Sequence, residues 1–212
     1  MTTKNAVTRG RPRDFDRNIA LEKALETFWQ YGYEASSLAL LKAAMGINSP
    51  SLYAAFGSKN ALFTEAVTFY LAKYGAYREK ALQSSKSARE GIAALFEQTL
   101  TQFFADERHK GCFVVLAALL GSQDSAPIRS MLNEERRRTS LLFERRLMEE
   151  QTAGDSAARQ QVHILAEYFT TVLFGLSIQV RDGVTEQEAR AVVNLALSVL
   201  KGNDEKTVSA QL

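Results

Sequence analysis

Hydroxyl and basic side chains gather at the starts of two helical patterns between Ser36 and Lys59. Ser36 and Ser37 precede one apolar run at helical spacing, and Ser58 with Lys59 precedes another. A hydroxyl at a helix start accepts a hydrogen bond from a backbone N–H, and the remaining N–H groups attract anions such as phosphate. These four residues are therefore predicted to contact phosphate groups.

The same stretch predicts two short helices joined by a tight turn. The first apolar run ends at Gly46, a residue typical of a left-handed helix end. Ser49 and Pro50 then predict a second helix, over about residues 50–56, that begins with a capping hydroxyl and a proline at its first position. This second helix turns Leu52 and Phe56 inward. A helix, a short turn with glycine and a second helix form the arrangement that places the second helix in a DNA major groove.

Bases are read by side chains near the start of such a second helix, whereas contacts to phosphates position the protein. The sequence predicts base contacts from Asn48, Ser49, Ser51 and Leu52. Asn48 has the donor and acceptor that adenine recognition requires. For Leu52 the alternative is a position wholly within the core.

The first 13 residues carry Arg9, Arg11 and Arg13 on a Gly- and Pro-containing segment that has no acidic residue. We expect a disordered basic arm whose arginines enter an adjacent minor groove; the alternative is a solvated tail. Residues 1–60 have a local net charge of +3 within a total of +2. A basic end on a nearly neutral body suits a polyanion-binding head.

The composition is that of an ordinary globular protein, with 46% apolar and 24% charged residues among 212. No run of about 18 uncharged apolar residues is present, so we expect no transmembrane helix. The N-terminus has no apolar segment of a secretory signal, and the single cysteine, Cys112, excludes an internal disulfide. These observations predict a cytoplasmic protein without a metal or a cofactor.

Catalysis has few candidate residues in this sequence. His109, His163 and Cys112 are the only imidazoles and the only thiol. His109 and Cys112 lie close enough in sequence to form a dyad, but no third orienting group accompanies them. No HExxH, GxSxG or glycine-rich phosphate loop is present, so we predict that the protein is not an enzyme and keep a Cys/His-dependent enzyme as a remote alternative.

Apolar periodicity and helix-capping signals predict an all-α fold of about nine helices. Asp16 caps the first and Gly32 ends it, and Thr185 with Glu188 forms a capping box for the last. The expected helices are 17–31, 38–45, 50–56, 58–83, 88–106, 111–120, 126–150, 154–181 and 186–201. The predicted divisions are an arm (1–13), a DNA-binding domain (14–62), a ligand-binding and dimerisation domain (63–202) and a frayed tail (203–212).

The run from Gly32 to Phe63 resembles the N-terminal DNA-binding domain of the TetR family of transcriptional regulators. The matching residues are Gly32-Tyr33, Ser36-Ser37, Gly46-Ile47, Leu52-Tyr53, Phe56, Ser58-Lys59 and Leu62-Phe63. The sequence departs from the family pattern at Lys42, Pro50 and Asn60, where alanine, a small residue and glutamate are usual. The resemblance is sharp over about residues 15–70, and it implies that the Tyr53 hydroxyl contacts the DNA backbone.

The resemblance also implies a homodimer in which the last two helices of each subunit form a four-helix bundle. The surplus of apolar residues in these helices favours such an interface, and an intramolecular interface is the alternative. The residues predicted to form it are Leu165, Val172, Leu176, Val180, Val192, Leu195 and Val199.

Members of this family typically bind a small molecule in the C-terminal domain. The residues predicted to line a pocket are Phe103, Phe104, Cys112, Phe113, Leu116, Phe143, Tyr168 and Phe169. The alternative for the aromatic residues is ordinary core packing. Cys112 is either a sensor of electrophiles or oxidants or an inert buried thiol.

Taken together, the sequence predicts a repressor that binds a palindromic operator in double-stranded DNA as a homodimer and is released by an unidentified small-molecule inducer, with no membrane partner. The alternative is a constitutive DNA-binding protein or an activator without small-molecule control.

Overall fold

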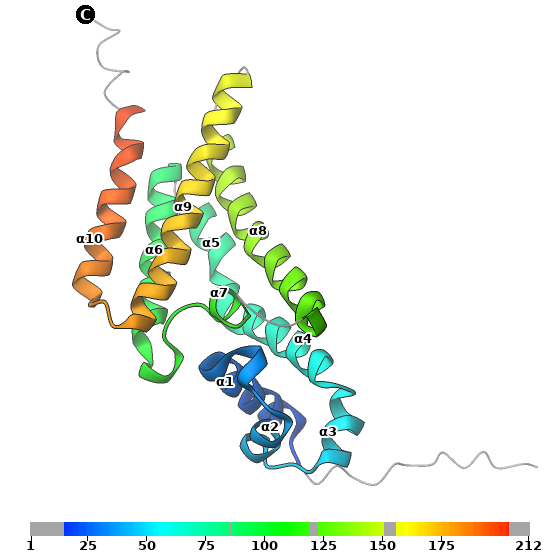
Figure 1. Ribbon diagram of the computed structural model, residues 1–212. Helices are drawn as coiled ribbons and strands as arrows, with labels where there is room; N and C mark the ends of the chain where they lie inside the picture. Colours follow the sequence, from blue (N-terminus) through cyan, green and yellow to red (C-terminus); the bar gives the residue numbers. More distant parts are fainter. Residues whose placement is uncertain (1–14, 85, 119–122, 151–155, 204–212) are drawn as a thin grey trace, which may run out of the picture.

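Asp16 begins the first helix, α1 (Arg17–Ala35), because its carboxylate accepts hydrogen bonds from the backbone N–H groups of Asn18 and Ile19. The computed structural model describes residues 15–84, 86–118, 123–150 and 156–203. These residues form helices and turns without any strand, which confirms the predicted all-α fold (Figure 1). Gly32, at φ +77°, interrupts the helical backbone of α1, as the sequence predicts.

Four helices form a head at one end of the molecule. They are α1, α2 (Leu38–Met45), α3 (Ser49–Phe56) and α4 (Lys59–Tyr70). Phe28, Leu41, Leu52 and Phe63 are buried between them in one hydrophobic cluster. This cluster fixes the angle at which α3 is held, since both Leu52 and Phe56 of α3 belong to it.

The predicted single long helix over residues 58–83, which would connect head and body, is wrong. The chain instead forms α4, a π-helical turn (Leu71–Gly75) and a short α5 (Tyr77–Gln83). A π turn contains an extra residue per turn, so the apolar face that follows it changes direction. Tyr70 and Tyr74, before and within that turn, both contact the ring of Trp29 in α1.

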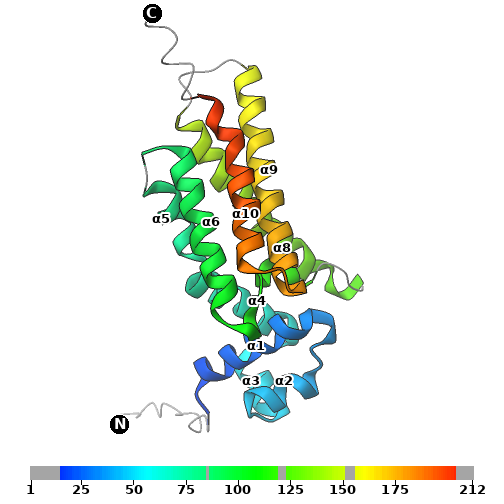
Figure 2. The ribbon, with the colours of Figure 1, turned by 90° about the vertical axis from the view of Figure 1, so that its left-hand side faces the viewer.

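The body contains α6 (Ala88–Ala105), α8 (Ala126–Met148), α9 (Ser156–Asp182) and α10 (Glu186–Leu197), which run along its length (Figure 2). Phe96, Phe143 and Phe169 meet in its core, with ring centroids 5.9–6.2 Å apart. Thr185 and Glu188 form the predicted capping box at the start of α10. The predicted start of α9 at residues 154 and 155 lies outside the described residues.

A helix over 111–120 is confirmed only for one turn, α7 (Phe113–Leu116). The carbonyl oxygen of Ala117 accepts a hydrogen bond of 2.7 Å from the backbone N–H of Tyr33 in the head. This apolar segment therefore serves as a contact between head and body, and residues 119–122 are not described.

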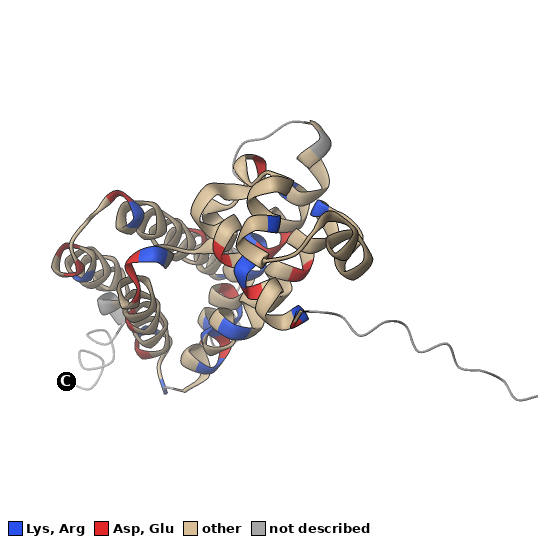
Figure 3. Ribbon diagram, turned by 90° about the horizontal axis from the view of Figure 1, so that it is seen from below, with Lys and Arg blue, Asp and Glu red and all other residues tan. Residues whose placement is uncertain are grey.

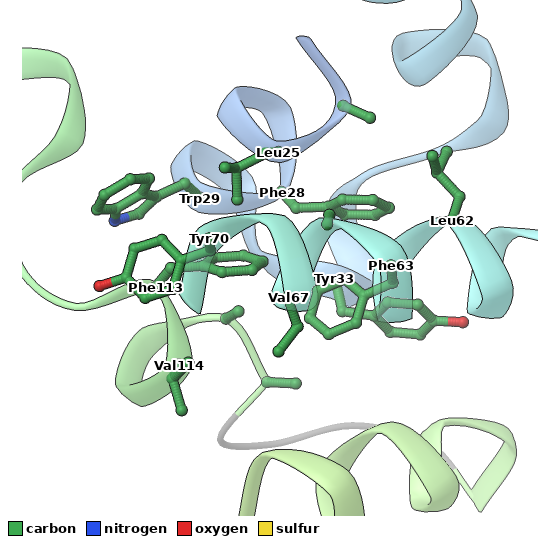
Figure 4. Packing of buried hydrophobic residues seen from close by; sticks show 14 of the residues in the cluster. Leu25, Phe28, Trp29, Tyr33, Leu62, Phe63, Val67, Tyr70, Phe113 and Val114 are labelled. Atoms are coloured by element: carbon green, nitrogen blue, oxygen red, sulfur yellow. The ribbon is translucent and has the colours of Figure 1, made fainter. Parts of the chain in front are cut away.

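Aromatic rings fill the junction between head and body (Figure 4). Phe113 of α7 contacts Phe63 and Tyr70 of α4, with ring centroids 5.4 Å apart in each pair. At the edge of this junction, Arg181 near the end of α9 donates hydrogen bonds to the carbonyl oxygens of Trp29 (3.0 Å) and Gln30 (2.6 Å). The guanidinium thus joins the end of α1 to a helix of the body.

Candidate DNA-binding site

The turn between α2 and α3 has the geometry that the sequence predicts. Gly46 adopts the left-handed conformation at φ +67°. Its N–H and that of Ile47 donate to carbonyl oxygens of the last turn of α2. Leu41 and Met45 of α2 and Leu52 of α3 are buried, so the two helices share one core and leave their other faces exposed.

Asn48, rather than Ser49, caps α3. The Asn48 Oδ1 accepts a hydrogen bond of 2.9 Å from the backbone N–H of Ser51, which makes Ser49 the first residue of the helix and Pro50 the second. The Ser49 hydroxyl accepts a hydrogen bond of 2.8 Å from the Lys42 ammonium. Lys42 therefore joins α2 to α3.

One face of α3 is exposed and carries polar side chains, and its opposite face is buried. Tyr53 is 49% exposed and Ser51 is half-buried, whereas Leu52 is buried. The prediction that Leu52 contacts bases is therefore wrong: its side chain belongs to the core of the head. Asn48 and Ser51 remain at the start of the exposed face, where a base-reading helix carries its specificity.

Two helix starts flank this face. The hydroxyl of Ser37 caps α2 by accepting from Leu40 N, and that of Ser58 caps α4 by accepting from Ala61 N, each at 3.1 Å. Both serines are exposed. Each cap lies beside N–H groups at a positive helix end, the arrangement that binds phosphate.

Ser36 does not share this arrangement, and its predicted phosphate contact is wrong. Its side chain is fully buried and its hydroxyl donates 2.6 Å to the carbonyl oxygen of Gly32. This bond lies within the last turn of α1, whose C-cap is Ser36. Only Ser37 of the pair therefore faces outward.

Lys59 lies at the start of α4 with its ammonium 4.4 Å from the centre of the Tyr33 ring. Burial lowers the pKa of Lys59, and the nearby Glu34 carboxylate opposes that shift. The stem of Lys59 is thus fixed against the head while its charge stays beside the α4 N-terminus. Arg9, Arg11 and Arg13 lie outside the described residues.

Charges of both signs are interspersed over the head, as the view from that end shows (Figure 3). Among the described residues, the candidate interface thus relies on helix N-termini, hydroxyls and Lys59 rather than on one broad basic patch.

Arg17 is a positioning residue that the sequence analysis missed. Its guanidinium lies 4.5 Å from the centre of the Phe56 ring, donates 3.1 Å to the carbonyl oxygen of Ala55 and pairs with Glu65 at 2.7 Å. Arg17 thus joins α1 to the end of α3 and to α4. No local pattern reveals this role, because Glu65 is 48 residues away in the sequence.

Arg17→Met is expected to lower the free energy of unfolding by about 1 kcal/mol, because it removes a charged hydrogen bond and a partly exposed ion pair. Operator binding should weaken with it, since the end of α3 loses its support. Urea denaturation and DNA titration measure the two effects. Lys23→Met, which breaks only an exposed ion pair with Glu26, is the control and should change stability by less than about 0.5 kcal/mol. Equal effects of the two variants would contradict this role.

The residues predicted to line a ligand pocket divide between the core of the body and its junction with the head. Phe143 and Phe169 are fully buried in the core of the body, and Tyr168 lies on its surface. Phe113 and Leu116 pack at the junction, where Phe104 packs against both cores. Of the predicted set, only Phe103 lines a cavity described below. The aromatic residues of this set are thus mainly core, the alternative that the sequence analysis left open.

Cys112 is buried in the junction. Its sulfur accepts hydrogen bonds from the Tyr70 hydroxyl (3.4 Å) and from Arg78 (3.6 Å). Burial, with the neighbouring thiol, raises the pKa of Tyr70 well above its usual range. The side chain of His109, the other member of the predicted dyad, lies outside what the structure describes. Among the described residues no group of three or more His, Cys, Asp or Glu side chains could hold a metal ion.

The predicted dimer residues divide between the inside and the outside of the body. Leu176 and Val180 are buried within the subunit, so their assignment to an intersubunit interface is wrong. Leu165 and Val172 are partly buried against the same core. Of the predicted residues, Val192, Leu195 and Val199 are exposed. With Ile164, Tyr168 and Ile178, exposed apolar residues of α9 that were not predicted, they form what we call the apolar stripe of α9, α10 and the turn that follows α10 (Ser198–Asn203).

Helix α9 carries apolar residues on both its buried and its exposed side, and it is therefore apolar over most of its length. Within the described residues, Ala157–Asp182 is the one helix long and apolar enough to cross a membrane, a test that core helices of soluble proteins also pass. Here α9 packs between α8 and α10.

Known proteins are similar to this chain in both fold and sequence. The model of the family "Bacterial regulatory proteins, tetR family" matches residues 20–66, which span most of the head. The chain is 32% identical over 191 residues to the HTH-type transcriptional repressor ComR of Escherichia coli (strain K12), covering 90% of this chain and 91% of ComR. The chain belongs to the TetR family. It is a transcriptional regulator, as that family membership implies.

Two further transcriptional regulators are similar to this chain. The structure of a cysteine mutant of the TetR family transcriptional regulator CifR in complex with 26-base-pair operator DNA has a TM-score of 0.83 and 45% identity, covering 89% of this chain and 98% of that one. The HTH-type transcriptional repressor BdcR of Escherichia coli (strain K12) is 26% identical over 204 residues, or 95% of this chain and 97% of BdcR.

Proposed function

We propose that this TetR-family protein is a homodimeric repressor that binds a palindromic operator and is released by a small molecule. The observation that carries the proposal is the exposed face of α3 between two outward-facing, serine-capped helix starts. The operator complex of CifR and the repressor role of ComR and BdcR support it by relationship.

In this proposal α3 enters the major groove. Asn48, Ser49 and Ser51 read base edges, with Asn48 keeping Oδ1 on its helix cap and Lys42 holding Ser49 in place. The backbone of the operator is held by Ser37, Ser58, Lys59 and the Tyr53 hydroxyl. The arginines Arg9, Arg11 and Arg13 enter the neighbouring minor groove.

The proposed dimer forms through the exposed apolar stripe of α9 and α10. In Figure 2 these helices lie side by side along one side of the body. Leu195 is 73% exposed, and a large apolar stripe of this kind marks an interface. A two-fold axis through the stripe would bury it against its own copy and place two heads on one palindrome.

The proposed release depends on contacts that join head and body. Arg181 holds the end of α1, and the Ala117 carbonyl accepts from Tyr33 N–H. A ligand that favours a different arrangement of these contacts would lower operator affinity. The domain boundary at residue 62 stays a prediction, and Phe63, Val67 and Tyr70 beyond it pack in the same cluster as the head.

Ser51→Ala is expected to change which bases the protein prefers at one position of each half-site, with a cost of about 1–3 kcal/mol at that position. Tyr53→Phe is the matched variant, because it removes a hydroxyl from the same helix. It should weaken binding to all DNA sequences about equally. Selection from a randomised duplex library, at one stated salt concentration, measures both. An unchanged preference for Ser51→Ala would contradict its assignment as a base-reading residue.

A further inference from the structure

A small cavity lies where the head meets the body, between the end of α1, the π turn after α4 and the end of α6. Its volume is about 130 Å³. An apolar cavity of about 150 Å³ in another protein holds benzene, so this cavity is close in size to one that takes a single aromatic ring. Its walls are mainly aromatic, with two polar side chains: Trp29, Tyr70, Tyr74, Gln102, Phe103 and Asp106.

The rings of Trp29, Tyr70 and Tyr74 pack against one another and together form the aromatic wall of the cavity. Trp29 meets Tyr70 edge-on at 5.0 Å and 90°, and it meets Tyr74 at 5.4 Å and 78°. Tyr70 and Tyr74 stack at 5.4 Å. Aromatic pairs prefer such edge-to-face and offset geometries, so a planar ring gains more here than an aliphatic group of equal volume.

Gln102 supplies the polar group of the cavity. The hydroxyl of Tyr70 is donated to Cys112, and the Asp106 carboxylate accepts from the backbone and the guanidinium of Arg108. The half-buried Gln102 amide makes no hydrogen bond to another described residue. A ligand that carries one donor or acceptor on its ring would satisfy this amide.

We propose that this cavity binds a single-ring aromatic molecule of the phenol class. The ring packs against the wall formed by Trp29, Tyr70 and Tyr74, and the hydroxyl bonds to Gln102. The inference rests on the ligand-controlled function proposed above and names its site and its ligand class.

The position of the cavity links its occupant to DNA binding. Trp29 belongs to α1, and Arg181 holds the carbonyl oxygen of that same residue. Tyr70 ends α4, whose other end follows α3. An occupant that alters these packing contacts favours a different position of the head and thereby lowers operator affinity.

Trp29 allows binding to be measured directly, because it is the only tryptophan in the chain. Titrating the full-length protein with phenol should produce a saturable change in tryptophan fluorescence at roughly 1 mM, the range expected for so small a ligand. Gln102→Leu should weaken phenol binding about fivefold, because it removes one hydrogen bond to the ligand. It should leave toluene binding undiminished, because toluene cannot form that bond. Gln98→Leu, one turn earlier on α6, exposed and outside the cavity, is the control and should change neither affinity.

No saturable change with phenol, or an equal loss for the Gln98 and Gln102 variants, would overturn the proposed site. Circular dichroism of each variant establishes that it is folded. Operator binding is then measured with and without phenol. If the fluorescence response depends on Gln102 but phenol does not change operator binding, the site is supported and its regulatory role is overturned. Failure to bind any operator would contradict the proposed repressor function, and the fluorescence result would still decide the site.

Discussion

The Leu195→Glu variant is expected to be monomeric and to bind the operator at least about 100-fold more weakly than the wild-type protein. Leu195 is the most exposed large apolar residue of the α9–α10 stripe. At the centre of a two-fold interface its replacement would bury two carboxylates without partners, which is strongly unfavourable. A monomer also loses the gain from binding two linked half-sites, which is typically about 10²–10⁴-fold.

Sedimentation and operator titration at one salt concentration measure the two effects. Asn194→Glu is the control, because it adds the same charge at the neighbouring exposed position of α10, outside the apolar stripe. It should remain dimeric. A Leu195→Glu protein that stays dimeric would contradict the assignment of this stripe to the interface.

The Phe63→Ala variant is expected to lose about 3–5 kcal/mol of stability, the cost of a large cavity in a core. Phe63 is fully buried, and its ring contacts Phe28 at 4.9 Å, Tyr33 at 5.1 Å and Phe113 at 5.4 Å. These partners belong to the head and to α7 (Figure 4). The substitution therefore weakens both the head and its contact with the body.

Urea denaturation measures this loss. Phe69→Ala on the same helix is the comparison, because Phe69 is only partly buried against the cluster and should cost less than half as much. If the two variants are equally stable, Phe63 does not have the central position that its contacts indicate.

Local chemistry was predictable from the sequence wherever a few neighbouring residues decide the backbone. Asp16 at the start of α1, Gly46 at the turn and the Thr185–Glu188 box are examples. Asn48 and the neighbouring Ser49 both suit a helix start. In the structure Asn48 caps α3, and the Ser49 hydroxyl instead accepts a hydrogen bond from Lys42 of the preceding helix.

Long-range contacts were not predictable in this way. Arg17 and Arg181 find partners in other helices, at 48 and more than 150 residues' separation. Nothing in their own segments indicates those partners.

The dimer residues illustrate a third limit. The apolar spacing of α9 identifies a broad stripe, but two sides of the helix carry apolar residues. The sequence does not tell which side faces the subunit's own core. In the structure Leu176 and Val180 face inward, while Ile164 and Ile178 are exposed.

Selection of genomic fragments with the purified full-length protein tests the central claim, that α3 of each subunit reads one half of a palindromic operator. Fragments are taken from the source organism's DNA and bound at physiological salt, because phosphate contacts alone give salt-sensitive binding to any sequence. The predicted result is enrichment of a palindrome whose half-sites lie about one helical turn, or a multiple of it, apart. Recovery of fragments without a shared sequence, or no recovery at all, would contradict the claim.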